Sequence, residues 1–473
     1  MPPLRLALPI GIGVLAALSL LVPFAPVYDP WAWLIWGREI VHLDLDTSVG
    51  PSWKPLPVIV TTAFAPSGDA APQLWLFLSR AGWLAAAALA WRLAARLVFP
   101  PRLATAIATR FAAGRMFRGR LVAGAVAALG IVLLFDPFTA WVRQFAGGLS
   151  EPLLVALVLG ATDRELARRP GQALALGAAA ALIRPEAWPF LAAYGILLWR
   201  RDPRLRRGAV AAAIAVPLLW VVPDLIGSGS PLTGAGRARA GDEGPVIEAL
   251  DALWRSFNLV LVGLWLCAGY AALTAWRDGE REIVVLAAGA LAWIGLVAVL
   301  AIGGYPGLPR FVAPAAAVVC VLGAVGLVRA IAAVDGMRSA DARRRWALAA
   351  TGAVIAAVAL QAGVRAAQIP GVVDDALDFG RTVDGLHEVT DRLDRDRLAA
   401  CDSVTTSDFL TETALAWDLD RPVDGVSLRI ESAPRRGIAL LNADAPRAAK
   451  EAVRAAGSRV AKAGGWSAYT ISC

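Results

Sequence analysis

The sequence predicts a mainly α-helical fold, in which a polytopic transmembrane helical bundle is followed by a small α/β domain. Of its 473 residues, 58% are hydrophobic, whereas about 45–50% are apolar in a typical soluble domain. Apolar runs of about 18 residues or more recur along most of the chain, and a helix of this length crosses the bilayer core. From about residue 374 onward the chain becomes polar, which predicts a folded unit outside the membrane.

The positions of the arginines predict the topology, because basic loops stay on the cytoplasmic side of a membrane. The segment 92–120 carries seven arginines and no acidic residue. Three more basic loops and one of mixed charge lie at 164–169, 200–207, 338–345 and 277–282. With all five loops in the cytoplasm, about eleven spans are predicted, with the N-terminus inside and the C-terminus outside. The predicted spans are 6–28, 72–99, 121–137, 139–162, 171–184, 186–199, 208–226, 250–276, 283–303, 311–334 and 346–366.

Two domains are predicted: a transmembrane domain, 1–366, and an extracytoplasmic α/β domain, 367–473. In the second domain, short apolar segments alternate with helical ones, and about a hundred residues are enough for a separate core. Cys401 and Cys473 both lie in it. In an oxidising compartment they are candidates for a disulfide, and two free thiols are the alternative.

The composition argues against several classes of function. The net charge is +8, but the arginines fall in short loops between spans, so they indicate topology rather than nucleic-acid binding. The chain has two histidines and four cysteines, with no Cys-x-x-Cys pair, which argues against a zinc site. No glycine-rich phosphate-binding motif stands between a strand and a helix, so chemistry driven by cytosolic nucleotides is not indicated.

The first external loop carries the clearest sign of chemistry. Asp29 stands where the first apolar run ends, Trp31 and Trp33 follow in an amphipathic stretch, and Lys54 precedes the second run. An aromatic belt at the membrane interface explains the tryptophans. It gives no reason for the lysine or for the carboxylate, although a simply solvated acid is the alternative for Asp29.

Three more charged residues are predicted near the same face. Asp136 stands at the outer end of the third span, either as a turn carboxylate or as a functional group. Arg143 and Glu151 are eight residues apart, which predicts that they share one helix face. Charged groups at membrane depth face a cavity or a partner, so a functional pair and a structural ion pair are both open.

Two interruptions of apolar runs add further charges. Arg184 and Glu186 flank Pro185, and a break of this kind is tolerated where it lines a cavity; a contact that only holds the break together is the alternative. Arg310 stands at the outer mouth of a span, where snorkelling to lipid headgroups is the alternative. The outer face is thus predicted to gather carboxylates and cations, the groups needed to deprotonate a hydroxyl and to bind a phosphate.

Four of these segments resemble motifs of the GT-C glycosyltransferases, polytopic enzymes that include protein O-mannosyltransferases, the lipid A aminoarabinose transferase and actinobacterial arabinofuranosyltransferases. The segments are Asp29 at the end of the first span, Trp53-Lys54-Pro55-Leu56-Pro57, the break from Ile183 to Glu186, and Leu308-Pro309-Arg310-Phe311. The resemblance covers 1–366 in topology. It implies a GT-C-like fold in the plasma membrane and transfer of a sugar from a polyprenyl-phosphate donor to a hydroxyl of a glycan, lipid or protein on the outer face.

The resemblance also implies roles for the residues. Asp29 would be the general base of an inverting transfer, and Lys54, Arg184 and Arg310 would bind the donor phosphate. The further candidates for substrate binding are Trp31, Trp33, Asp136, Arg143, Glu151 and Glu186. Several relatives have two adjacent acids where Asp29 stands alone, and a single carboxylate is a poor Mg²⁺ site. A divalent metal is therefore not favoured, and no other cofactor is expected.

Three other classes of function compete with a transferase. A polysaccharide polymerase or ligase also works on lipid-linked sugars, and it usually depends on a large outer loop with paired arginines. A transporter of lipid-linked sugars would need polar groups near the bilayer midplane and often has internal repeats; none is apparent in the sequence. A membrane scaffold without catalysis would leave the one-sided set of charges unexplained.

Overall fold

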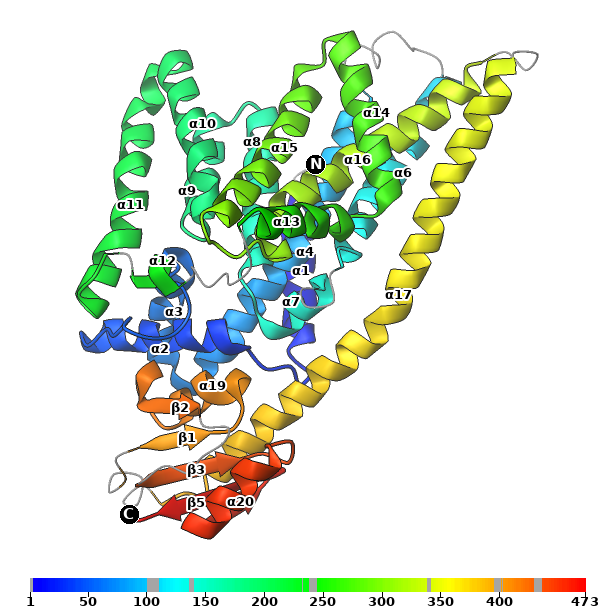
Figure 1. The fold of residues 1–473 in the computed structure, drawn as a ribbon. Helices are drawn as coiled ribbons and strands as arrows, with labels where there is room; N and C mark the ends of the chain where they lie inside the picture. The colour runs from blue at the N-terminus through cyan, green and yellow to red at the C-terminus, as the bar shows by residue number, and fades with distance from the viewer. Residues whose placement is uncertain are drawn as a thin grey trace.

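The computed structural model describes residues 3–99, 110–135, 140–231, 233–237, 245–337, 342–394, 401, 403–428 and 436–473. These residues form a bundle of helices and, at one end of it, a small sheet (Figure 1). The predicted class, a helical membrane bundle followed by a C-terminal α/β unit, is confirmed. Asp136 lies outside the described residues.

The helices of the bundle start with α1 (Pro3–Ser19), α2 (Tyr28–His42), α3 (Pro55–Phe64) and α4 (Ala71–Leu97). In Figure 1, α2 lies crosswise between the bundle and the sheet. The remaining helices are α6 (Arg110–Val132), α7 (Trp141–Gly147), α8 (Glu151–Leu166), α9 (Pro170–Ala181), α10 (Trp188–Arg201), α11 (Arg206–Ser228), α12 (Thr233–Arg237), α13 (Pro245–Leu259), α14 (Val262–Asp278), α15 (Arg281–Ile302), α16 (Ala313–Asp335) and α17 (Ala342–Thr390). Short 3₁₀ turns, η2 (Pro185–Ala187) and η4 (Pro309–Val312), precede α10 and α16.

The chain is a multi-pass membrane protein. Among the described residues, five helices are long and apolar enough to cross a membrane, or up to seven if two bent helix pairs each count as one span. The predicted number of eleven is not confirmed. The predicted spans 171–184 and 186–199 correspond to α9 and α10, which have 12 and 14 residues. At about 1.5 Å per residue such helices are shorter than the roughly 30 Å of a bilayer core.

Helix α16 forms the centre of the bundle, and its whole apolar segment is buried. Small residues make this possible, because they let helix backbones approach closely. A Cβ added at Gly326 would lie 1.8 Å from the carbonyl oxygen of Cys267 in α14, and one at Gly323 would lie 2.6 Å from that of Leu264. The α14–α16 contact therefore depends on two glycines that a hydropathy pattern does not distinguish from other apolar residues.

The C-terminal unit contains a five-stranded sheet of order β2-β1-β3-β5-β4. Its strands are β1 (Val404–Thr406), β2 (Val426–Leu428), β3 (Gly437–Leu441), β4 (Ser458–Ala463) and β5 (Trp466–Ile471). The first three are parallel, and β5 runs antiparallel to β3 and β4. Helices α19 (Glu412–Asp418) and α20 (Arg447–Ala456) complete the unit. Helix α17 continues across residue 366, so the predicted division at that residue stays a prediction.

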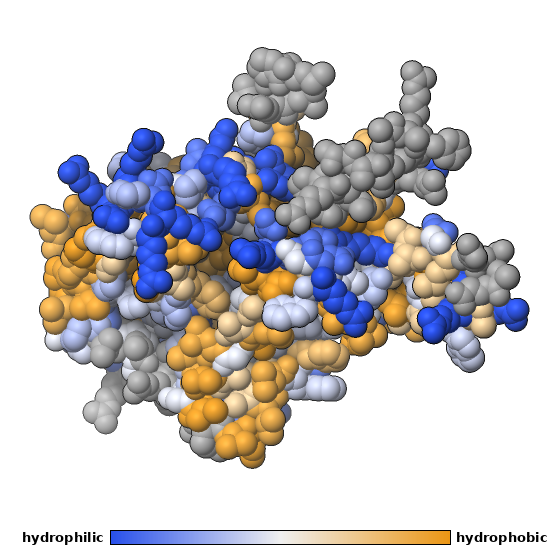
Figure 2. Space-filling view, turned by 90° about the horizontal axis from the view of Figure 1, so that it is seen from above, coloured by the Kyte–Doolittle hydropathy of each residue, from blue (hydrophilic) through white to orange (hydrophobic). Residues whose placement is uncertain are grey.

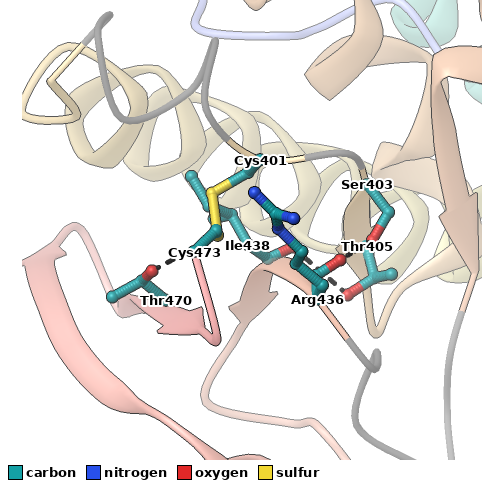
Figure 3. The surroundings of a disulfide bond; sticks show 7 residues. All are labelled: Cys401, Ser403, Thr405, Arg436, Ile438, Thr470 and Cys473. Carbon is teal, nitrogen blue, oxygen red and sulfur yellow. Dashed lines mark hydrogen bonds between the residues drawn. A yellow bond between two sulfur atoms is a disulfide. The ribbon is translucent and has the colours of Figure 1, made fainter.

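A disulfide joins Cys401, just before β1, to Cys473, after β5 (Figure 3). The Cα atoms of the two residues lie 5.4 Å apart. The bond closes a loop over a sequence separation of 72 residues, and closing a long loop restricts the unfolded chain. The cysteine pair thus ties the last strand to the first strand of the sheet.

The sheet unit is fastened to α2. Arg38 donates hydrogen bonds to the carbonyl oxygens of Trp417 (3.3 Å) and Arg421 (2.8 Å) and forms an ion pair with Asp420 (2.7 Å). At the other end of α2, the rings of Tyr28 and Phe409 stack with centroids 4.4 Å apart. The crosswise helix is therefore held on both sides, by the bundle and by the sheet unit.

The end of the bundle opposite the sheet is rich in charged side chains. Figure 2, which looks onto that end, shows hydrophilic residues gathered there, with hydrophobic residues towards the edges of the view. Ion pairs hold helix ends together there, such as Arg92 with Asp163 at 2.8 Å and Arg329 with Glu280 at 2.7 Å. This distribution agrees with basic loops that share one side of the membrane; which side they face stays a prediction.

Candidate active site

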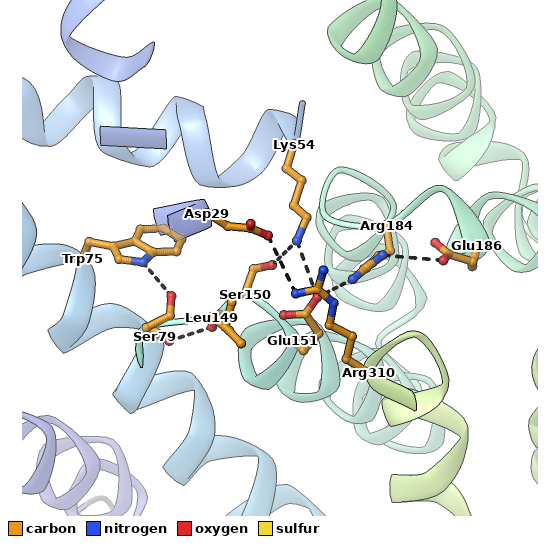
Figure 4. A network of polar contacts seen from close by, with 11 residues as sticks. Asp29, Lys54, Trp75, Ser79, Leu149, Ser150, Glu151, Arg184, Glu186 and Arg310 are labelled. Carbon is orange, nitrogen blue, oxygen red and sulfur yellow. Dashed lines mark hydrogen bonds and ion pairs between the residues drawn. The ribbon is translucent and has the colours of Figure 1, made fainter. Parts of the chain in front are cut away.

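A cluster of charged side chains lies where α2, α3, α8, η2 and η4 begin (Figure 4). We call Asp29, Lys54, Glu151, Arg184, Glu186 and Arg310 the charged cluster. Four of its members stand directly before a proline. Proline pushes the preceding residue into extended backbone, and Lys54 (φ −134°, ψ 107°) and Arg184 (φ −142°, ψ 128°) have that conformation. The prolines therefore hold Lys54 and Arg184 just before α3 and η2, whereas Asp29 and Glu151 lie in the first turns of α2 and α8.

Glu151 is the centre of the buried part of the cluster. Its Oε1 lies 3.5 Å from the Nζ of Lys54, and Arg184 forms an ion pair and a hydrogen bond with the same oxygen. Lys54 also donates a hydrogen bond to the Oγ of Ser150 at 3.0 Å. Arg184 lies 3.8 Å from the carboxylate of Glu186 on its other side. All four charged side chains are almost fully buried, with exposed fractions of 0–5%.

Aromatic rings cover the two buried cations. The Nζ of Lys54 lies 4.8 Å from the ring centre of Trp33, and the guanidinium of Arg184 lies 3.9 Å from that of Phe311. A cation over an aromatic face is stabilised by about 0.5–2 kcal/mol, more when water is excluded. The rings thus help to keep both charges inside the protein.

Burial shifts the pKa of Lys54. It lowers the pKa of the ammonium group from 10.5 to about 8, although the nearby Glu151 acts in the opposite direction. Desolvation therefore outweighs the ion pair at this side chain. Lys54 is positively charged at neutral pH and loses its charge as the pH rises through about 8.

Asp29 and Arg310 form the more open edge of the cluster. Their charged groups lie 3.9 Å apart, and the side chains are 18% and 25% exposed. Asp29 and Trp33 are four residues apart on α2 and face the cluster, whereas Tyr28 and Trp31 face the sheet unit, where Trp31 lies 6.0 Å from Trp417. The start of α2 therefore contacts the charged cluster on one face and the sheet unit on another.

Helix α4 fixes the turn that presents Glu151. The indole of Trp75 donates a hydrogen bond to the carbonyl oxygen of Gly148, and the hydroxyl of Ser79 donates one to that of Leu149, each at 2.8 Å. Figure 4 shows both contacts beside the cluster. Trp75 and Ser79 are not among the site residues predicted from the sequence; their i, i+4 spacing on an apolar helix is the only signal of a shared role.

Other predicted site residues lie elsewhere. Arg143 is in α7 and pairs with Asp375 of α17 at 2.9 Å, and the two side chains are 41% and 65% exposed. Its predicted place on one helix face with Glu151 is wrong, because the chain bends by 112° between α7 and α8. Among the described residues, no group of three or more His, Cys, Asp or Glu side chains could hold a metal ion.

Comparisons with known proteins identify the fold. No protein-family model and no curated protein sequence matches the chain significantly. It is similar to the structure of ArnT from Cupriavidus metallidurans in the apo state, with a TM-score of 0.54, 14% identity, and coverage of 99% of this chain and 98% of that chain. ArnT bound to undecaprenyl phosphate is similar with a TM-score of 0.52 at 15% identity, covering 98% and 97% of the two chains. The chain thus shares the fold of ArnT over nearly its whole length.

Proposed function

We propose that the protein is a membrane glycosyltransferase that moves a sugar from a polyprenyl-phosphate donor to an acceptor hydroxyl. The observation that carries this proposal is the partly exposed carboxylate of Asp29 at the edge of a cluster with three cationic side chains. A carboxylate beside cations suits a reaction that removes a proton at one point and releases a phosphate at another. The shared fold with ArnT, which has been solved with undecaprenyl phosphate, supports a lipid-linked donor.

In the proposed mechanism Asp29 is the general base. It takes the proton of the acceptor hydroxyl while the hydroxyl oxygen attacks the anomeric carbon of the donor. The bond from that carbon to the phosphate oxygen breaks in the same displacement, and its electron pair leaves with the polyprenyl phosphate. A single displacement of this kind inverts the anomeric centre.

Lys54 and Arg310 are proposed to neutralise the charge that develops on the leaving phosphate. Stabilisation of developing charge is usually the largest catalytic effect in such a site. Arg184 would contribute positive charge from deeper in the protein, since it lies between Glu151 and Glu186 and is only 4% exposed. We assign Trp33 to holding Lys54 rather than to stacking on a sugar, because its ring is buried beneath the Nζ atom.

The chemistry is proposed for the outer face of the plasma membrane, with the N-terminus in the cytoplasm and the sheet unit outside. The disulfide of that unit supports this placement, because such bonds persist in oxidising compartments. The acceptor is proposed to be a hydroxyl of a cell-envelope glycan, lipid or protein.

Replacement of Asp29 by Asn tests the proposed base. Asn has the same shape and cannot accept the proton, and loss of a general base typically costs about 10²–10⁴-fold in rate. The assay is sugar transfer from a polyprenyl-phosphate sugar by the purified full chain in nanodiscs, with thermal unfolding measured in parallel. Near-normal transfer by the Asn variant would contradict the role of Asp29 as base.

A further inference from the structure

Every cation of the charged cluster already has an acidic partner. Lys54 and Arg184 share Glu151, Arg184 also lies near Glu186, and Arg310 lies near Asp29, all within 4 Å. A phosphate that enters this site therefore has to take a cation away from a carboxylate or share it. Which pair yields depends on the free energy needed to break each one.

The pairs differ strongly in that cost. Breaking a buried ion pair by removing one partner is strongly unfavourable, because the other charge is left without compensation in a medium of low dielectric constant. Glu151 has an exposed fraction of 0%, so Lys54 and Arg184 belong to this class. An exposed ion pair contributes little to stability because water screens it. Asp29–Arg310 is closest to this class, since the two side chains are partly exposed and their charged groups lie 3.9 Å apart.

Arg310 is also the least constrained cation. The Nε atoms of Arg310 and Arg184 both lack a hydrogen-bond partner among the described residues, so the two cations differ in their ion pairs instead: Arg184 lies near two carboxylates and Arg310 near one. Its guanidinium lies 5.7 Å from the ring centre of Phe311, whereas that of Arg184 lies 3.9 Å from the same ring. The side chain that is cheapest to move is thus the one paired with Asp29 (Figure 4).

We propose that Arg310 exchanges partners during the reaction: it holds Asp29 in the resting site and moves to the phosphate when the lipid donor binds. The exchange frees the carboxylate to accept the proton of the acceptor hydroxyl. Donor binding therefore precedes activation of the acceptor. After the sugar has moved, Arg310 stays on the leaving phosphate and returns to Asp29 when the lipid departs. This inference rests on the proposed function, because it takes the lipid phosphate as the ligand of the cluster.

The exchange predicts an effect opposite to that of an ordinary loss of function. Asp29→Asn removes the competitor for Arg310, so the variant binds undecaprenyl phosphate more tightly than the unmodified chain. The expected gain is about two- to fivefold, which corresponds to an ion pair of up to 1 kcal/mol. Arg310→Gln is expected to weaken the same binding.

The test is a titration of the full chain in nanodiscs with undecaprenyl phosphate itself, without sugar or acceptor. Asp29→Asn, Arg310→Gln and the double variant are compared with Asp375→Asn, a matched control that breaks an exposed Asp–Arg pair outside the cluster, with Arg143 at 2.9 Å. Tighter binding by Asp29→Asn, no further gain from Asp29→Asn in the Arg310→Gln background, and no change in the control support the exchange.

Two results would overturn it. One is an unchanged or weakened affinity of the Asp29→Asn variant; the other is an equal gain in the double variant, which would show a general effect of removing negative charge. Should Arg310→Gln fail to fold, Arg310→Met, which also removes the charge, replaces it in the cycle. The outcome is separable from that of the transfer assay. Asp29→Asn can abolish transfer without tightening lipid binding, and it can tighten lipid binding without abolishing transfer.

Discussion

Glu151→Gln is the substitution with the largest consequence predicted from the structure. The side chain is fully buried and is the shared partner of Lys54 and Arg184. Arg184 keeps Glu186 at 3.8 Å after the change, whereas Lys54 keeps the hydroxyl of Ser150 and the ring of Trp33 but no carboxylate within ion-pair distance among the described contacts. Removal of one partner from a buried ion pair costs about 3–5 kcal/mol. Lys54 can escape part of this penalty by losing its proton, so we expect a loss of about 3 kcal/mol.

The proton loss also predicts a change in binding. The pKa of Lys54 is about 8 and the charge of Glu151 raises it, so without Glu151 the pKa falls further and a larger fraction of Lys54 is neutral at a given pH. A hydrogen bond to a charged group contributes about 1.5–3 kcal/mol, so the affinity for undecaprenyl phosphate should fall by about 10- to 100-fold. Binding should recover as the pH is lowered, because the phosphate then binds together with a proton.

The assay combines thermal unfolding in nanodiscs with titration of undecaprenyl phosphate at several pH values. Glu388→Gln is the matched control, since Glu388 is 53% exposed and pairs with Arg392 on one helix face; such a pair contributes at most about 0.5 kcal/mol. If Glu151→Gln behaved like this control in both measurements, Glu151 would not be the centre of the site.

Three further predictions concern Lys54, the disulfide and the contact between α2 and the sheet unit. In the unmodified chain, the affinity for undecaprenyl phosphate should be highest below about pH 8 and decline above it, because the protonated form of Lys54 binds the anion. In Lys54→Arg this decline should be absent from titrations between pH 7 and 10. A decline that persisted in the variant would show that another group titrates. Cys401→Ser should lower the stability of the sheet unit by about 2–4 kcal/mol, measured as faster proteolysis of that unit, and equal resistance of both forms would refute this. Arg38→Ala should weaken the contact between the sheet unit and α2, which would be detected as faster hydrogen exchange in residues 409–421. The affinity for undecaprenyl phosphate should stay unchanged; a loss of affinity would mean that the contact between α2 and the sheet unit shapes the charged cluster.

The sequence predicted the members of the charged cluster better than their arrangement. The charges at positions 29, 54, 151, 184 and 310 stood out because ionised groups at the ends of apolar runs are costly. Their meeting point depends on tertiary packing that no local pattern encodes. Arg143 illustrates this limit: the sequence around Gly147 and Gly148 gave no measure of the 112° bend that separates it from Glu151.

The span count shows a second limit. Hydropathy reports how apolar a segment is and not whether it runs straight through a bilayer. Helix α13 and helix α14 read as one predicted span, 250–276, and they meet at 90°. The small α/β unit was predictable because alternating polar and apolar segments are a local signal, whereas the fastening of that unit to α2 through Arg38 was not.

The most direct test of the account is a structure of the full chain with undecaprenyl phosphate. We predict phosphate oxygens within about 3 Å of the Nζ of Lys54 and of the guanidinium of Arg310, with the carboxylate of Asp29 released and facing the acceptor side. A phosphate bound away from Lys54, or an Asp29–Arg310 pair that stays intact beside the bound lipid, would contradict the account.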